Sequence, residues 1–125
     1  MSFIESELDR IGDADELVLV ARRPDGTERR PVSIWVVRVG DGLYVRSWRG
    51  TRAAWYCAID RNAHARITSG GITKAVRFIP AGGELDDAID AAYRTKYARY
   101  PSYVEPMLST QARSATFALN PAEAS

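Results

Sequence analysis

The chain has 125 residues, of which 46% are hydrophobic and 26% are charged, and its formal net charge at pH 7 is +1. This length suits one domain with a full hydrophobic core, so we expect a single domain over residues 1–125. The near-zero net charge provides no general attraction to nucleic acid or to an acidic membrane surface, and we expect neither as a partner.

Two residue types that often carry chemistry occur only once each. Cys57 is the only cysteine and His64 the only histidine. A disulfide within the chain is therefore excluded, and a cysteine-based zinc site or a Ser-His-Asp triad is disfavoured. No apolar run approaches the ~20 residues that span a membrane, and the N-terminus lacks a signal-peptide pattern. We expect a reduced, cytoplasmic protein without a metal, whose chemistry comes from a bound cofactor.

The first half of the chain alternates apolar and turn residues in a way that predicts a helix followed by a β-meander. The helix is predicted over residues 3–11 and ends at Gly12. Three strands follow, Leu17–Arg22, Thr27–Val39 and Leu43–Trp48, joined by tight turns at residues 24–26 and 40–42. Because proline cannot donate to a strand ladder, Pro31 marks an edge or a bulge.

The second half mixes helices and strands. The predicted elements are a helix over residues 51–61 with Thr51 as its N-cap, strands His64–Thr68 and Ile72–Ile79, a break at residues 80–83, a helix over Glu84–Tyr100, a loop with Tyr103 and Pro106, and a strand over Ser114–Leu119. Six strands joined mostly by hairpins do not fit a parallel doubly wound sheet. We predict an α+β fold, mostly β: a six-stranded antiparallel barrel with covering helices.

The sequence LYVRSWRGTRAAWY, residues 43–56, contains the strongest functional signal. Arg49 and Arg52 lie at the positive end of the predicted helix, where the helix dipole disfavours cations. An anion bound there by amides, dipole and guanidinium groups would explain them. We therefore predict a phosphate or carboxylate site formed by Arg46, Arg49, Thr51 and Arg52. The alternative is that these arginines pair with carboxylates of the same chain or of a partner chain.

Aromatic side chains form the second candidate group. Tyr93, Tyr97 and Tyr100 fall on one face of the long predicted helix. A tyrosine stripe of this kind is typical of a packing face or a dimer interface. The functional alternative has Tyr97 or Tyr103 closing a pocket. The only cysteine and the only histidine give a weaker functional signal. Cys57 fits a small buried hydrophobic position, and His64 fits the end of a strand.

Several segments resemble the split β-barrel superfamily of pyridoxamine-phosphate oxidase-like flavoproteins and deazaflavin-dependent nitroreductases. They are Trp35, LYVRSW with RGTRAAWY, IDAAYRTKYARYPSYVEPMLS and Ala115–Thr116. The chain is more closely similar to a family of small proteins, a domain of unknown function, usually placed beside those enzymes. The resemblance covers residues 16–120 and implies a split barrel, a homodimer, and a flavin or deazaflavin at the interface between subunits.

The resemblance also assigns candidate site residues. It places Arg46, Ser47, Arg49, Thr51 and Arg52 at the cofactor phosphate. From the aromatic cluster we add Trp48 to the cofactor-binding residues and predict a pocket formed by Trp35, Trp55, Lys96, Tyr97 and Tyr103. The chain departs from the flavoproteins at two places. Arg-Gly-Thr-Arg stands where they usually have Ser-Arg-Lys, and residues 61–63, Arg-Asn-Ala, stand where an Asn-Pro pair is usual.

Two functions remain open at this point. The first is a small dimeric oxidoreductase that uses flavin mononucleotide (FMN) or a deazaflavin to act on a small organic substrate, because the cofactor itself then supplies the hydride chemistry. The alternative is a non-enzymatic barrel that binds a small acidic or aromatic ligand or a protein partner. The two departures from the flavoprotein pattern favour the alternative.

Overall fold

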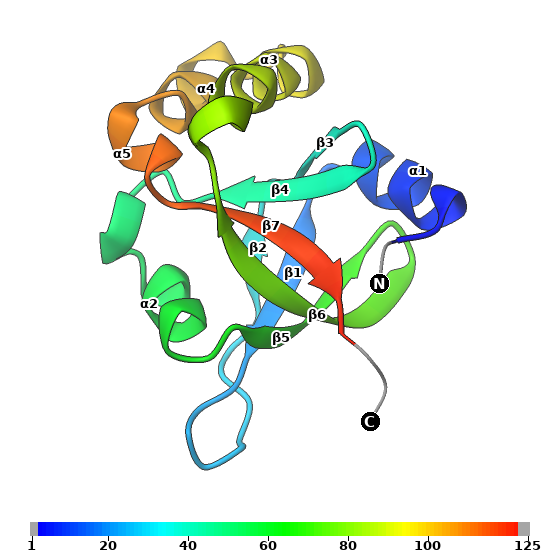
Figure 1. Ribbon diagram of the computed structural model, residues 1–125, viewed down its shortest axis with the longest axis vertical. Coiled ribbons are helices and arrows are strands. Elements are labelled where there is room, and N and C mark those ends of the chain that lie inside the picture. The colour runs from blue at the N-terminus through cyan, green and yellow to red at the C-terminus, as the bar shows by residue number, and fades with distance from the viewer. Residues whose placement is uncertain (1–2, 123–125) are drawn as a thin grey trace.

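A computed structural model describes residues 3–122 and shows an antiparallel sheet curled into a half-barrel, with helices over its open sides (Figure 1). The strands are β1 (Leu17–Ala21), β2 (Val32–Ile34), β3 (Val37–Val39), β4 (Gly42–Arg46), β5 (His64–Ser69), β6 (Ile72–Ala81) and β7 (Thr116–Pro121). The helices are α1 (Glu5–Asp13), α2 (Ala54–Arg61), α3 (Asp86–Lys96), α4 (Pro101–Met107) and α5 (Thr110–Arg113). Two short 3-10 turns, η1 (Gly50–Arg52) and η2 (Gly83–Leu85), precede α2 and α3.

The order of the strands explains the curl. Across the sheet it is β2-β1-β5-β6-β7-β4-β3, so β2 and β3 are the two edges. These edge strands nevertheless follow each other in the chain, separated only by Trp35 and Val36. Consecutive Cα atoms are about 3.8 Å apart, so Ile34 and Val37 lie at most about 11 Å from each other. The sheet must therefore curl back on itself, and we call residues 35–36 the seam.

The split-barrel prediction is confirmed, with seven strands among the described residues in place of six. The difference comes from Thr27–Val39, predicted as one strand. Its extended chain crosses from one sheet edge to the other, because Ile34 is opposite Leu17 whereas Val37 is opposite Tyr44. The segment before β2 contributes only an isolated bridge between Arg22 and Glu28.

The predicted break at Pro80 is wrong, because β6 continues to Ala81. The Phe78 N–H donates to the Ala63 carbonyl, on the side of β6 that faces β5. Backbone groups two residues apart in a strand point to the same side, so the Pro80 nitrogen faces that side too. The pairing of β6 with β5 has ended at Arg77. The missing N–H of Pro80 therefore interrupts no ladder.

Three helix predictions also need correction. The helix predicted to begin at Thr51 begins at Ala54 with Ala53 as its N-cap, and Thr51 lies in the preceding 3-10 turn. The helix predicted over Glu84–Tyr100 ends at Lys96. The loop predicted around Tyr103 and Pro106 is helical, because α4 begins at Pro101, at the position where a missing N–H needs no partner.

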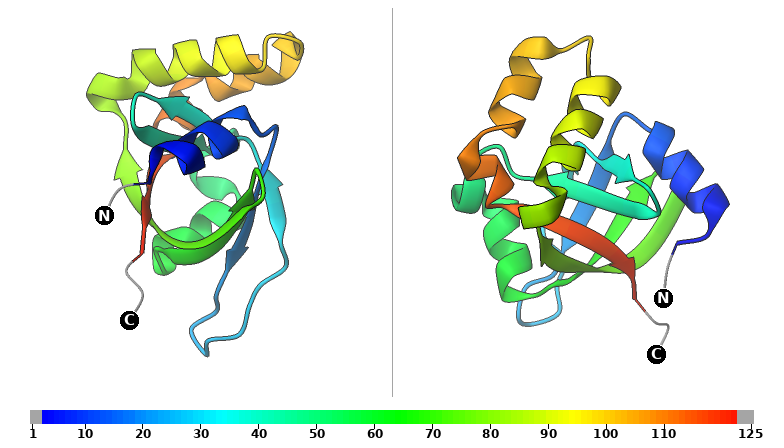
Figure 2. Two further views of the ribbon diagram at one scale, coloured as in Figure 1. Left: turned by 90° about the vertical axis from the view of Figure 1, so that its right-hand side faces the viewer. Right: turned by 45° about the horizontal axis from the view of Figure 1, so that its top comes forward.

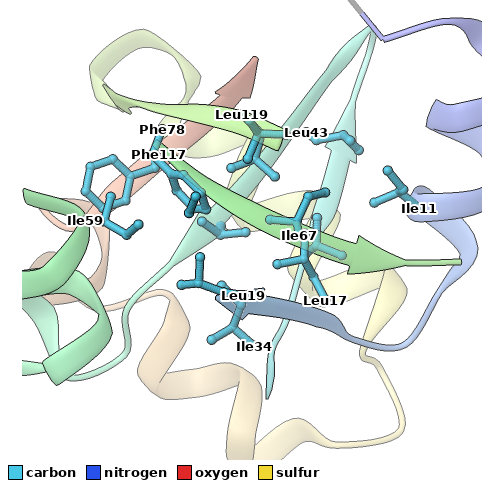
Figure 3. Packing of buried hydrophobic residues seen from close by; sticks show 14 of the residues in the cluster. Ile11, Leu17, Leu19, Ile34, Leu43, Ile59, Ile67, Phe78, Phe117 and Leu119 are labelled. Atoms are coloured by element: carbon cyan, nitrogen blue, oxygen red, sulfur yellow. The ribbon is translucent and has the colours of Figure 1, made fainter. Parts of the chain in front are cut away.

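The main core fills the inside of the half-barrel (Figure 3). It combines side chains from the concave face of the sheet with residues of α1 and α2, among them Ile11, Leu17, Leu19, Leu43, Ile59, Ile67, Phe78, Phe117 and Leu119. A second cluster lies between α3, α4 and β3 and includes Val37, Ile89, Tyr93, Tyr97 and Met107. Figure 2 shows α3 and α4 side by side over this end of the barrel. The interpretation of the tyrosine stripe as a packing face is thus confirmed for Tyr93 and Tyr97.

No helix within residues 3–122 combines the length and the apolar character that crossing a membrane requires.

Candidate functional site

An open pocket of about 890 Å³ lies beside the seam, between β2, the turn after β4, the start of α2, and α4. This volume is within the range of small-molecule sites, about 300–1,000 Å³. Seven of the predicted site residues line it: Trp35, Arg46, Ser47, Trp48, Arg49, Trp55 and Tyr103. The other four, Thr51, Arg52, Lys96 and Tyr97, do not. Tyr100 of the predicted tyrosine stripe also lines it, and lining residues that the sequence did not indicate include Ser33, Ala53, Ser102 and Met107.

One end of the pocket is suited to an anion. The Ser47 side chain is 1% exposed, and its hydroxyl has no hydrogen-bond partner among the described residues. Ala53, the N-cap of α2, supplies no capping side chain, so the first amides of this helix have no partner from a cap. Free amides and the helix dipole make such a terminus attractive to negative charge. A buried hydroxyl without a partner costs about 1–3 kcal/mol, which a ligand oxygen could offset.

Arg49 adds positive charge at the same end. Its guanidinium lies 5.1 Å from the centre of the Trp48 ring, in a cation–π arrangement, and both residues line the pocket. Within residues 3–122 Arg49 forms no ion pair with a carboxylate. The turn that carries it is held by the Gln111 amide, which donates to the Trp48 carbonyl at 2.9 Å. Gly50 has a φ of 64° and packs against Gln111, where a Cβ atom would collide.

Arg46 has a different environment. It is 1% exposed, and its guanidinium forms a buried ion pair with Asp90 and a longer one, 3.4 Å, with Asp86. It also donates to the Thr116 hydroxyl at 3.1 Å and to the Met107 carbonyl at 3.0 Å. All three of its nitrogens are therefore engaged within the protein. Its predicted role in binding a ligand stays a prediction, and its observed contacts join β4 to α3 and β7.

Asp90 is the centre of this ion-pair network, because it accepts from both Arg46 and Arg113. Burial raises the pKa of its carboxyl, but hydrogen bonds from Arg113 and Arg46 outweigh this effect and lower the pKa overall. The charged form is thus retained in the interior. Arg46 and Asp90 are paired with each other inside the protein. By contrast, among residues 3–122 the Ser47 hydroxyl has no hydrogen-bond partner and the Arg49 guanidinium forms no ion pair.

An aromatic wall lies along the seam side of the pocket. Trp35 stacks on Tyr97, with ring centroids 3.8 Å apart and planes 3° from parallel. Tyr97 itself is buried behind Trp35. Lys96 is also behind the wall, where it lines a separate cavity of about 470 Å³ with Asp13 and Arg38. Burial lowers the pKa of Lys96 to about 8. The predicted contact of Lys96 with a ligand in the aromatic pocket is therefore not supported by its position.

The remaining singled-out residues lie outside the pocket. Cys57 is exposed, and its thiol donates to the Thr51 carbonyl at 3.3 Å, so the expectation of a buried cysteine is wrong. The exposed face of α2 explains this, because its buried residues are Ala58 and Ile59. His64 is exposed at the first residue of β5, in accordance with a strand-end position. Within residues 3–122 no group of three His, Cys, Asp or Glu residues is arranged to hold a metal.

Comparison with known proteins identifies a family and a fold. A family model described as "Uncharacterized protein conserved in bacteria (DUF2255)" matches residues 7–119. Among proteins with curated descriptions, none matches the sequence significantly.

Solved structures share the fold at low sequence identity. A protein of unknown function from Agrobacterium tumefaciens, Atu2129, is 11% identical with a TM-score of 0.63; the match covers 95% of this chain but only 55% of that one. A structure described as an F420 reductase is 15% identical with a TM-score of 0.58, and the match covers 97% of both chains. A putative pyridoxamine 5'-phosphate oxidase from Listeria innocua is 12% identical with a TM-score of 0.59, covering 95% of this chain and 93% of that one. These similarities show a common split-barrel fold.

Proposed function

The chain belongs to the DUF2255 family, and we propose that it is a small, homodimeric, cytoplasmic protein that binds FMN or a deazaflavin and acts as an oxidoreductase on a small organic substrate. The observation that carries this proposal is the buried Ser47 hydroxyl, which has no partner among the described residues and belongs to a residue that lines the pocket together with Arg49 and the uncapped start of α2. F420 is a deazaflavin, so the fold shared with an F420 reductase adds support.

The pocket fits a flavin-like molecule in two respects. Its anion-binding end offers a hydroxyl, a guanidinium and helix amides, which are the donors that a phosphate group requires. The rest of its lining is rich in aromatic and apolar side chains, including Trp35, Trp55 and Met107, which suit a planar conjugated ring. Among the described lining residues there is no Asp or Glu to repel a phosphate. A bound flavin or deazaflavin would itself supply the hydride chemistry.

The rim of the pocket supports a homodimer. Trp48, Tyr100 and Tyr103 line the pocket and are 52%, 40% and 69% exposed, and we call them its rim. Exposed aromatic side chains gathered at one site are typical of a surface that a partner covers. A second copy of the chain at this rim would exclude water from a bound ring.

The non-enzymatic alternative keeps one observation in its favour. The described lining residues include arginines, serines and tyrosines but no His, Cys, Asp or Glu, so the pocket lacks a side chain that ordinarily exchanges a proton near neutral pH. A pocket of this composition also suits a barrel that only binds a small acidic or aromatic ligand.

Two measurements in sequence test the proposal. Absorbance titrations with FMN and with F420 should show a saturable spectral change for one of them. The protein loaded with that cofactor, in reduced form, should then pass its electrons to an artificial acceptor faster than the free cofactor does. Binding without such an acceleration would favour the non-enzymatic alternative. No saturable change with either cofactor would overturn the proposal.

A further inference from the structure

The seam presents a problem of backbone hydrogen bonding. Val36 lies between the two edge strands, and neither the β1–β2 nor the β3–β4 pairing includes it. Its side chain is fully buried, so water cannot easily serve its backbone groups. Unpaired backbone groups in such a place are costly and need partners from elsewhere.

Two consecutive residues at the end of α3 supply these partners. The Tyr97 hydroxyl accepts from the Val36 N–H at 3.2 Å and lies within donating distance of the carbonyls of Asp15, at 2.8 Å, and Val36, at 3.2 Å. The Lys96 ammonium donates to the same Val36 carbonyl at 2.6 Å. Both backbone groups of Val36 are thus satisfied by side chains that come from outside the sheet.

The same tyrosine also contacts the neighbouring seam residue. Its ring stacks on Trp35, and Trp35 forms part of the pocket wall. The hydroxyl of Tyr97 therefore fixes the backbone of Val36, and the face of the Tyr97 ring fixes the ring of Trp35. Neither Tyr97 nor Lys96 lines the pocket, and Trp35 is the lining residue on which the Tyr97 ring stacks, so an effect of the Tyr97 side chain on a ligand is expected to pass through Trp35.

We propose that Lys96 and Tyr97 are positioning residues, which close the barrel seam at Val36 and thereby hold Trp35 as a rigid wall of the ligand pocket. The seam closure stands on its own, whereas its consequence for ligand binding rests on the proposed function. A ligand that stacks on an already fixed Trp35 ring does not have to immobilise that ring, so binding costs less conformational entropy. The rigid wall should therefore favour a planar ligand.

The chain offers matched controls for both residues. Tyr97→Phe removes the hydroxyl and keeps the stacked ring, whereas Tyr93→Phe removes a hydroxyl that has no partner among the described residues, one turn earlier on the same helix. Lys96→Met removes the donor to Val36. Its control is Lys74→Met, because Lys74 is the only other lysine and pairs with Glu7 at 2.6 Å, away from the seam.

Amide exchange measured by NMR tests the seam without any ligand. We expect the Val36 amide to exchange about tenfold faster in Tyr97→Phe, in keeping with the loss of one buried hydrogen bond, and the Trp35 indole signal to broaden. Tyr93→Phe should change neither. If Tyr97→Phe fails to fold, Lys96→Met tests the seam through the Val36 carbonyl: it keeps the Tyr97 hydroxyl as acceptor of the Val36 N–H, so we expect a smaller acceleration of Val36 exchange than in Tyr97→Phe, and none in the control Lys74→Met. Unchanged exchange at Val36 in the seam variant would overturn the proposal.

Titration with FMN and with riboflavin, which lacks the phosphate, tests the pocket. Tyr97→Phe should weaken binding of both probes by the same factor, about tenfold, because Trp35 would hold the ring and not the phosphate. Faster Val36 exchange with unchanged affinities would overturn the link from seam to pocket. If the wild-type protein binds no flavin or deazaflavin while Val36 exchange accelerates in the variant, the proposed function fails and the seam closure stands.

Discussion

Arg46 and Ser47 are consecutive in the chain and each is 1% exposed, but their polar groups have opposite surroundings. The guanidinium of Arg46 meets two carboxylates, a hydroxyl and two carbonyls, so that every nitrogen is engaged. The hydroxyl of Ser47 meets no partner among the described residues. Two arginines only three positions apart differ in the same way, because Arg46 is buried in an ion-pair network whereas Arg49 lies against Trp48 at the pocket.

This difference separates the groups that hold the fold from those that are available to a ligand. A buried polar group with all its partners stabilises the arrangement of the elements it joins, here β4 with α3 and β7. A buried polar group without a partner costs stability, and such groups in native proteins are concentrated where function needs them. The two classes should therefore respond to mutation in opposite directions.

The largest expected effect is on stability, at Asp90. Asp90→Ala leaves Arg46 buried without its main partner, and we expect the free energy of unfolding to fall by about 3–5 kcal/mol in urea denaturation. Asp87→Ala is the control, because Asp87 lies on the same helix and also meets Arg113, but its side chain is 97% exposed. That variant should lose at most about 0.5 kcal/mol. Equal losses in the two variants would contradict a structural role for the buried network.

The next effect is on binding, at Arg49. Arg49→Ala should lower the affinity for FMN by about 10- to 100-fold, the range expected for loss of a charge-assisted hydrogen bond, and leave the affinity for riboflavin nearly unchanged. Arg52→Ala is the matched control, because Arg52 is exposed on η1 and does not line the pocket. Fluorescence titration of the wild type and of both variants, each with FMN and with riboflavin, makes the comparison. An equal loss in Arg52→Ala would remove the distinction between these two arginines.

Ser47→Ala should separate stability from binding. Removing an unpartnered buried hydroxyl should leave the free energy of unfolding unchanged or raise it by up to about 1 kcal/mol. The same variant should bind FMN about tenfold more weakly, because one phosphate donor is gone. Thermal or urea unfolding and FMN titration of one preparation measure both. A clear loss of stability would show that the Ser47 hydroxyl has a partner in the protein.

The smallest effect is the response of stability to alkaline pH, through Lys96. Its pKa is lowered from 10.5 to about 8 by burial. Between these values the unfolded chain binds more protons than the folded protein, so the free energy of unfolding should rise with pH. The full shift would give about 2 kcal/mol from pH 8 to 10, and we expect about 1 kcal/mol because solvent screens this partly exposed group. Burial also raises the pKa of Tyr97, whose opposing effect begins above pH 10. Subtracting the profile of Lys96→Met isolates the lysine, and parallel profiles would contradict the assignment.

The fold was largely predictable because its signals are local. Alternation of apolar residues and tight glycine turns located most of the sheet. The failures were places where a distant partner decides the outcome. Thr27–Val39 divides into two strands because its neighbours change at Trp35, and Pro80 is tolerated because β5 ends beside it.

The site was predictable in part for the same reason. The residues of the turn after β4 are close together in the sequence, and the three tryptophans stand out by their residue type. Both groups line the pocket. The sequence could not distinguish Arg46 from Arg49, because the partner of Arg46, Asp90, is 44 residues away. It also placed Tyr97 and Lys96 in the pocket, whereas their contacts with Val36 lie about 60 residues along the chain.

The central claim is that Ser47, Arg49 and the start of α2 form a phosphate site, and the most direct test compares probes with and without the phosphate. We would measure the affinities of the wild-type protein and of the Ser47→Ala, Arg49→Ala double variant for FMN and riboflavin, and for F420 and its phosphate-free chromophore. The account predicts that the wild type prefers the phosphorylated member of one pair by about 100-fold or more, and that the double variant loses the preference. Equal affinity for both members of each pair, or a preference that survives in the double variant, would contradict it.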